Sequence, residues 1–250
     1  MTTLVLLHAF PLSSWMYGPV RAELAGVPLV TPDFPGFGGA QPPQGTEEPS
    51  LEAYAQAVDA VVCGIDDAVV LGGTSMGGYV TLAYAAAYAE RLDERVVGLA
   101  LLDTKASADP EAAQANRLRQ AAAAEADGLA VLLDEVAPKL LGEASASLRP
   151  DLVEQVRAQV ADAPPPAVAF ALRAMAARED TLEVLRALNG LPAVVLRGAD
   201  DVLSTHADVE AMAGALGCPV TTIAGAGHLA ALEQPATVAA ALRAMVEALA

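Results

Sequence analysis

The sequence predicts an α/β fold in which helices cover both faces of a mostly parallel β-sheet of about six strands. Short runs rich in Val, Ile and Leu alternate with longer Ala-rich patterns that are typical of helices. The short runs hold few polar positions, as strands buried on both faces of a sheet do. The chain has 250 residues, 54% of them hydrophobic, which is enough for one large domain or two small ones with a sizeable core.

The predicted elements follow one another in a regular order along the chain. The strand patterns cover residues 3–8, 28–31, 68–72, 96–102, 193–197 and 220–223. Helical patterns cover residues 50–65, 76–92, 206–216 and 235–249. Because ligands bind at the carboxyl ends of parallel strands, we expect the functional residues at these ends.

The segment of residues 106–188 interrupts this alternation and has no convincing strand pattern. Prolines at positions 110, 138, 150 and 164–166 divide it into four or five predicted helices. We predict that it forms a helical lid over the strand ends, and that residues 1–105 and 189–250 form the core domain. In the alternative, these helices pack against the flank of the sheet, although one crossover rarely needs so many residues.

The charge of the chain limits its partners. It has 14 basic and 31 acidic residues, a net charge of −17, so we expect neither nucleic acid nor an anionic membrane surface as a partner. The uncharged stretch of residues 68–89 is long enough to span a membrane, but two glycine pairs around Ser75 favour a strand, a turn and a helix instead. Residues 1–20 lack the basic start of a signal peptide, so we do not expect one there. Cys63 and Cys218 lie far apart, so a cytoplasmic protein with no disulfide framework and no metal site is expected.

The strongest local motif is Gly-Thr-Ser-Met-Gly at residues 73–77, between a predicted strand and a predicted helix. Chance gives about 0.05 occurrences of this spacing in such a chain. A tight strand-to-helix turn holds the serine in a strained, exposed position beside the N–H groups of the helix start. Ser75 is therefore a candidate nucleophile. The alternative is a glycine-rich turn in which the serine only caps the helix.

A serine hydroxyl needs a general base, and the chain offers three histidines. His228 lies between the last strand and the last helix, after a glycine-containing loop that can bring its imidazole to Ser75. His206 falls in the first turn of a predicted helix, where an exposed surface histidine is expected. His8 ends the first strand, and we expect it to fasten a loop. His228 is therefore our candidate base.

A buried carboxylate must hold the imidazole in one tautomer and stabilise its charged form. Three aspartates follow predicted strands and can do so. Asp103 follows the fourth strand, and the neighbours Asp200 and Asp201 follow the fifth. The residues alone leave this choice open.

The loop after the first strand supplies a candidate oxyanion hole. The step from Phe10 to Pro11 turns the chain sharply at the strand end. This turn can direct the Phe10 N–H into the site, where it pairs with the N–H of Met76.

These motifs together resemble the α/β-hydrolase superfamily over nearly the full length of the chain. The resemblance rests on His-Ala-Phe-Pro at 8–11, Asp-Phe-Pro-Gly-Phe-Gly at 33–38, the motif at 73–77, the Gly-x-x-Asp turn ending at Asp201, and Gly-His before the last helix. It implies the α/β-hydrolase fold, without the first two strands of the family, and a triad of Ser75, Asp201 and His228. Ala9 replaces the usual glycine beside the oxyanion residue.

Within the superfamily, the sequence is similar to small bacterial esterases, enol-lactonases of the 3-oxoadipate type and cofactor-free haloperoxidases. The resemblance implies a serine hydrolase that cleaves a small ester or lactone without metal or organic cofactor. Perhydrolase or haloperoxidase-like activity is one alternative, and a small-molecule receptor or signalling protein on the same fold is another. We expect an apolar substrate pocket that includes Trp15, Phe170 and Met175. Any basic lid residue that points inward would favour a substrate with a carboxylate, and these residues are Arg117, Arg119, Lys139, Arg149, Arg157, Arg173 and Arg178. The oligomeric state is left open.

Overall fold

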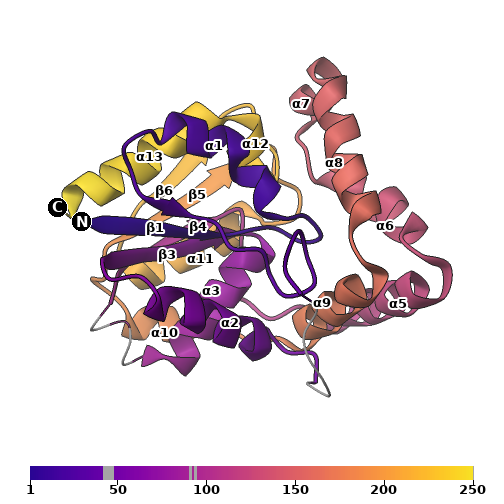
Figure 1. Ribbon diagram of the computed structural model, residues 1–250, viewed down its shortest axis with the longest axis horizontal. Helices are drawn as coiled ribbons and strands as arrows, with labels where there is room; N and C mark the ends of the chain where they lie inside the picture. The colour runs from indigo at the N-terminus through magenta and orange to yellow at the C-terminus, as the bar shows by residue number, and fades with distance from the viewer. Residues whose placement is uncertain (42–47, 90–91, 93–94, 250) are drawn as a thin grey trace.

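Figure 1 shows the computed structural model of the chain, which describes residues 1–41, 48–89, 92 and 95–249. Within these residues, six parallel strands form one sheet in the order β2-β1-β3-β4-β5-β6. The strands are β1 Thr2–Leu7, β2 Leu29–Val30, β3 Ala68–Thr74, β4 Val96–Leu102, β5 Ala193–Gly198 and β6 Val220–Ile223. The predicted α/β fold with about six strands is confirmed, and its sheet is entirely parallel.

The middle of the sheet is the core of the protein. Every residue of β1 is buried, and so is every residue of β3 after Ala68. The edge strands differ, since β2 has two half-buried residues and β6 has two exposed threonines. Burial on both faces explains why the central strands read as uninterrupted apolar runs in the sequence.

Helices cover both faces of this sheet (Figure 1). One face carries α1 Gly18–Glu23, α12 Ala230–Glu233 and α13 Pro235–Ala248. The other carries α2 Leu51–Cys63, α3 Met76–Ala87, α10 Leu182–Ala187 and α11 His206–Leu216. Helix α3 ends at Ala87, before the predicted end at residue 92, and residues 90 and 91 of the predicted helix lie outside the described residues. The sequence patterns missed the short helices α1 and α12.

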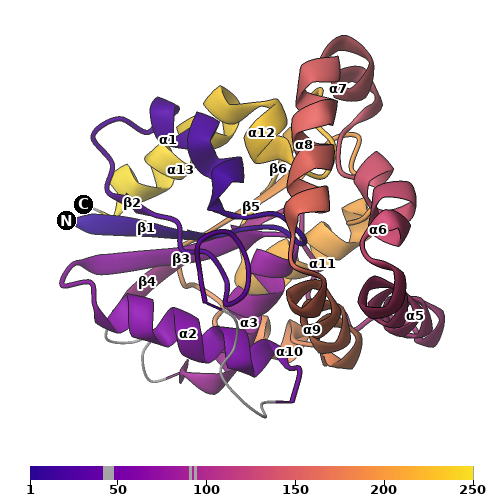
Figure 2. The ribbon, with the colours of Figure 1, turned by 45° about the vertical axis from the view of Figure 1, so that its right-hand side comes forward.

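The remaining helices stand beyond the carboxyl ends of the strands, and we call them the lid helices. They are α5 Glu111–Asp127, α6 Ala130–Glu135, the 3-10 helix Ala137–Lys139, α7 Glu143–Leu148, α8 Pro150–Asp162 and α9 Pro165–Ala177. The turned view of Figure 2 shows α5 and α9 side by side, in agreement with their many contacts. Prolines start α8 and α9 because the first turn of a helix needs no N–H from them.

The lid segment differs from expectation in two respects. It contains six α-helices, α5 to α10, rather than four or five. Two of them, α6 and α7, have only six residues each. Its last helix, α10, packs against α3 and α11 in the core. The division at residue 188 stays a prediction. No described helix is both long and apolar enough to cross a membrane.

The start of α3 lies very close to the end of β1. A Cβ atom added at Gly77 would lie 2.0 Å from the carbonyl oxygen of Leu7, a backbone atom that cannot move aside. Helix α3 therefore approaches the sheet at a distance that only glycine permits. This approach places the first turn of α3 directly beside the strand ends.

We predict that Gly77→Ala lowers the free energy of unfolding by about 3 kcal/mol, because the added methyl group collides with backbone. Gly214→Ala is the matched control, since Gly214 lies in α11 and a Cβ there has open space. The control should gain about 1 kcal/mol from helix propensity. Urea unfolding of both variants measures the difference, and equal stabilities would contradict the close approach.

Candidate active site

Ser75 lies at the turn between β3 and α3, where the backbone is strained. Its φ is +55° and its ψ is −115°, a conformation that costs free energy for a residue with a side chain. Its N–H donates to the carbonyl of Leu102 at 3.0 Å, and the Thr104 hydroxyl donates to its carbonyl at 2.8 Å. These bonds to β4 and to the residues that follow it hold the turn in place. The half-buried Ser75 side chain therefore stands at the carboxyl end of the sheet.

His228 lies in the loop between β6 and α12 and contacts one of the three candidate carboxylates. Its ring is 3% exposed. The Nδ1 atom lies 2.9 Å from Oδ2 and 3.0 Å from Oδ1 of Asp201. With Nδ1 as the donor to this carboxylate, Nε2 is left as the proton acceptor.

Asp201 is oriented by a second set of hydrogen bonds. Its Oδ1 accepts from the N–H of Leu203 at 2.7 Å and from that of Ser204 at 3.3 Å, and the Ser204 hydroxyl donates to Oδ2. Burial alone would raise the pKa of this carboxyl, but the hydrogen bond from His228 and those from Ser204 and Leu203 lower it below its ordinary value. The carboxylate is therefore ionised near neutral pH.

The other two candidate carboxylates have different environments. Asp200 is exposed to solvent. Asp103 is fully buried and accepts from the N–H groups of Gly198 at 2.6 Å and Ala230 at 3.3 Å. Burial and the nearby charge of Asp201 raise the pKa of Asp103 well above its ordinary value. The structure thus brings Asp201 to His228, while Asp103 ties the end of β5 to the start of α12.

The candidate oxyanion donors lie on two neighbouring segments. No hydrogen bond within the described residues occupies the N–H of Phe10 or of Met76. Phe10 lines the pocket that contains Ser75, and Met76 starts helix α3. Ala9 stands where the family usually has glycine, and its φ is not positive. Among the described residues other than glycine, a positive φ occurs at Ser75 and Asp103.

His8 fastens the loop that carries Phe10. It is fully buried, its Nδ1 lies 3.0 Å from the carbonyl of Ala9, and its Nε2 accepts from the N–H of Phe34 at 3.0 Å. Burial lowers the pKa of His8 to about 4, so its ring is neutral. His206 is exposed and lies 3.1 Å from Glu210 on the next turn of α11. Neither histidine lines the pocket that Ser75 lines.

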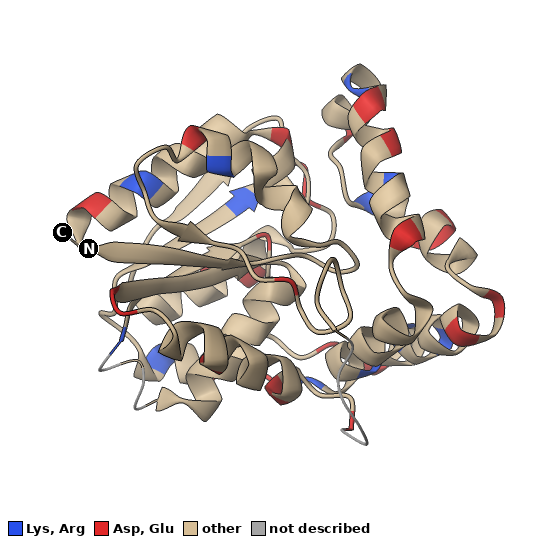
Figure 3. Cartoon of the chain, viewed as in Figure 1, with Lys and Arg blue, Asp and Glu red and all other residues tan. Residues whose placement is uncertain are grey.

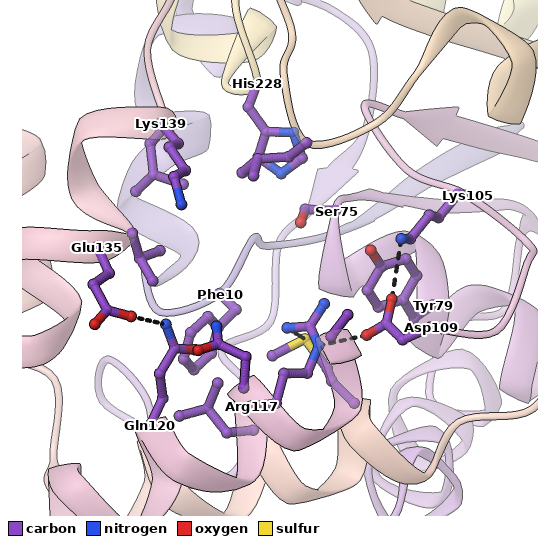
Figure 4. A pocket seen from close by; sticks show the side chains of 17 residues that line it. Phe10, Ser75, Tyr79, Lys105, Asp109, Arg117, Gln120, Glu135, Lys139 and His228 are labelled. Atoms are coloured by element: carbon purple, nitrogen blue, oxygen red, sulfur yellow. Dashed lines mark hydrogen bonds and ion pairs between the residues drawn. The ribbon is translucent and has the colours of Figure 1, made fainter. Parts of the chain in front are cut away.

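Ser75 and His228 line one pocket of about 220 Å³ between the core and the lid helices. Figure 4 shows both residues at its rim, with lid side chains opposite. The lining residues are Phe10, Ser75, Tyr79, Lys105, Asp109, Ala113, Asn116, Arg117, Gln120, Glu135, Val136, Lys139, Leu140, Leu172, Met175, Leu203 and His228.

One of the three expected pocket side chains lies in this pocket. Met175 lines it, and its sulfur lies 3.4 Å from the Arg117 guanidinium. Trp15, in the 3-10 helix Ser14–Tyr17, instead lines a separate hollow with Phe37 and Pro164. Phe170 faces α2 and packs edge-on against Tyr54, with the ring centres 5.5 Å apart. Trp15 and Phe170 are therefore not among the lining residues.

Glu233 is a residue of this site that the sequence analysis missed. Its carboxylate is 4% exposed. It accepts from the N–H groups of Gly227 at 2.8 Å and Leu229 at 3.3 Å, on either side of His228, and from that of Gly142 in the lid at 2.9 Å. The sequence signal for Glu233 is an acidic residue within an apolar stretch, five positions after His228. A carboxylate buried in such a stretch needs hydrogen-bond donors around it.

The described residues offer no evident metal site. No three His, Cys, Asp or Glu side chains among them lie close enough together to hold an ion.

Comparison with protein families assigns residues 4–241 to the model described as the alpha/beta hydrolase family. No curated protein sequence matches the chain. Among solved structures, a thermophilic esterase from Thermogutta terrifontis, solved with malate bound, is 35% identical with a TM-score of 0.91. That match covers 100% of this chain and 90% of the esterase.

Two further structures share the fold at lower identity. The enol-lactonase from Burkholderia xenovorans LB400 is 21% identical with a TM-score of 0.85, over 99% of this chain and 92% of that chain. The bromoperoxidase from Bacillus anthracis is 18% identical with a TM-score of 0.82, over 99% of this chain and 92% of that chain. At these identities the two structures show the fold alone. The family match and the similarity to the 35% identical esterase support a hydrolase.

We predict that Glu233→Gln lowers the free energy of unfolding by about 2 kcal/mol, because an amide cannot accept from all three backbone N–H groups. Glu247→Gln, at an exposed position of α13, removes the same charge and corrects for the change in net charge. Thermal and urea unfolding give the comparison. If the two variants were equally stable, Glu233 would not hold the His228 loop and the lid together.

Proposed function

The chain belongs to the alpha/beta hydrolase family, and we propose that it is a serine hydrolase that cleaves a small carboxylic ester or lactone through an acyl-enzyme. One observation carries the proposal: a histidine bonded to a buried, ionised aspartate lines the same pocket as a serine on a strained turn. A buried imidazole with a free Nε2 is what a serine hydroxyl needs to become a nucleophile.

In the proposed first step, the Ser75 oxygen attacks the substrate carbonyl carbon and its proton passes to Nε2 of His228. Asp201 stabilises the imidazolium that forms and keeps the ring in the required tautomer. The negative oxygen of the tetrahedral intermediate accepts from the N–H groups of Phe10 and Met76, which have no partner within the described residues. The intermediate collapses when His228 returns the proton to the leaving alkoxide.

In the proposed second step, water replaces the alcohol beside His228 and attacks the acyl group on Ser75. The imidazole accepts a proton from the water and then gives it to the Ser75 oxygen, which leaves as the hydroxyl. A lactone follows the same route, with its alcohol remaining attached to the acyl chain. Every group in this scheme is a protein group or water, so the proposal includes no metal and no organic cofactor.

The size of the pocket supports a small substrate. About 220 Å³ accommodates a short acyl chain and alkoxy group, and side chains of the lid helices line the pocket together with Ser75. The similarity to an esterase at 35% identity supports ester cleavage. We place the activity in the cytoplasm because both cysteines, Cys63 and Cys218, are free thiols.

We predict that Ser75→Ala lowers kcat for a simple aryl ester by about 10⁴-fold or more, because the nucleophile is lost. The fold should remain, since alanine removes one oxygen from a half-buried position. Steady-state hydrolysis of 4-nitrophenyl acetate, with many turnovers per wild-type molecule, gives the reference rate. A variant that kept more than a tenth of this rate, or a wild type that stopped after one turnover, would refute the proposal.

We predict that Asp201→Asn lowers kcat by about 10²- to 10⁴-fold, since an amide loses the charge and can select the wrong tautomer of His228. Its neighbour provides the matched control. Asp200→Asn makes the same change on an exposed side chain, and its kcat should stay within about tenfold of the wild-type value. Equal losses in both variants would show that the contact between Asp201 and His228 does not serve catalysis.

A further inference from the structure

The pocket holds positive charge in a strongly acidic protein. The chain has a net charge of −17, and Figure 3 shows acidic residues on both the core and the lid helices. The sequence contains two lysines in all, Lys105 and Lys139, and both line this pocket together with Arg117. A cationic recess in an acidic surface attracts anions and holds them where the solvent screens charge least.

One side of the pocket is a cluster of three cations around a single carboxylate. Asp109 lies 3.0 Å from Lys105, 2.6 Å from Arg117 and 2.8 Å from Arg178. Burial opposes ionisation of this carboxyl, but Arg117 and Arg178 hold its pKa far below its ordinary value. Lys105, Arg117 and Asp109 line the pocket, whereas Arg178 is buried outside its lining. Two cations and one carboxylate therefore leave this wall with a positive excess.

Lys139 lies on the other side of the pocket, near Glu135, and forms no salt bridge within the described residues. It belongs to the 3-10 helix of the lid, and Figure 4 shows its ammonium group extending into the pocket. The neighbouring carboxylate, Glu135, is turned toward other partners, since it accepts from Gln120 at 3.0 Å and from Arg119. Those hydrogen bonds and the charges of Arg119 and Lys139 lower the pKa of Glu135. The Glu135 carboxylate bonds to Gln120 and Arg119, so the ammonium group of Lys139 keeps its hydrogen-bond donors for a ligand.

We propose that the substrate carries a carboxylate in addition to its ester group, and that Lys139 binds this carboxylate while the ester carbonyl lies at Ser75. The inference rests on the proposed hydrolase function and specifies its substrate class. The pocket volume of about 220 Å³ fits short half-esters of dicarboxylic acids and lactones that bear a carboxylate. The positive wall around Asp109 adds a favourable field on the side opposite Lys139.

The experiment compares two methyl esters of the same length and shape. Monomethyl glutarate carries a carboxylate at its far end, and the methyl ester of glutaramic acid carries a neutral amide there. We expect the wild type to hydrolyse the first with a kcat/KM about tenfold higher or more, mainly through a lower KM. Lys139→Met should abolish most of this ratio, Lys139→Arg should retain it, and Arg186→Met should leave it unchanged. Arg186 is the control because it lies in α10, outside the pocket lining.

The proposal is overturned if the wild type does not prefer the half-ester, or if the preference survives in Lys139→Met. Calorimetric binding of glutarate to the folded wild type and to Lys139→Met separates this result from a failure of the hydrolase assignment. If neither ester nor 4-nitrophenyl acetate is cleaved, the hydrolase function fails. If Lys139→Met binds glutarate about tenfold more weakly than the wild type, the carboxylate site is still supported. If the two proteins bind glutarate equally, or if the wild type does not bind it, the carboxylate site is overturned.

Discussion

The site depends on the strained turn at Ser75. A residue with a side chain adopts a φ of +55° only where the surrounding structure holds it there. Here the N–H and the carbonyl of Ser75 are bonded to Leu102 and Thr104, and Gly77 allows α3 to approach β1 closely. The free energy stored in this turn is offset by the buried central strands on either side. The result is a hydroxyl held at the carboxyl end of the sheet.

The same parallel sheet brings the other candidate groups to this point. Because all strands run in one direction, the segments after β4, β5 and β6 meet at one edge, where Asp103, Asp201 and His228 lie. Two buried acidic residues then bind backbone N–H groups of these loops. Asp103 bonds to Gly198 and Ala230, and Glu233 bonds to both sides of His228 and to the lid. These acidic side chains position the loops without contacting the reacting groups.

Sequence patterns predicted the features that depend on local chemistry. The strands are short apolar runs, and the turn at Ser75 needs glycines in fixed places. The choice of Asp201 comes from the resemblance to the family, because the residues alone leave three aspartates open. The pocket walls depend instead on how lid helices pack across long distances in the chain, which no local pattern encodes. Trp15 and Phe170 are large and apolar, but Trp15 lines a separate hollow and Phe170 packs against Tyr54. The pocket is lined instead by the charged residues Lys105, Asp109 and Arg117. The signal for Glu233 is weak, an acidic residue in an apolar stretch, because its partners are backbone N–H groups that every sequence has.

The central claim is that Ser75 is an activated nucleophile, and covalent labelling tests it most directly. A fluorophosphonate reacts with such a serine to form a phosphonyl ester and release fluoride, and mass spectrometry of the digested protein locates the adduct. Our account predicts one adduct per chain, on the peptide that contains Ser75, and none on the other serines of the folded protein. An adduct on a different residue, or none at all on the folded protein, would contradict it.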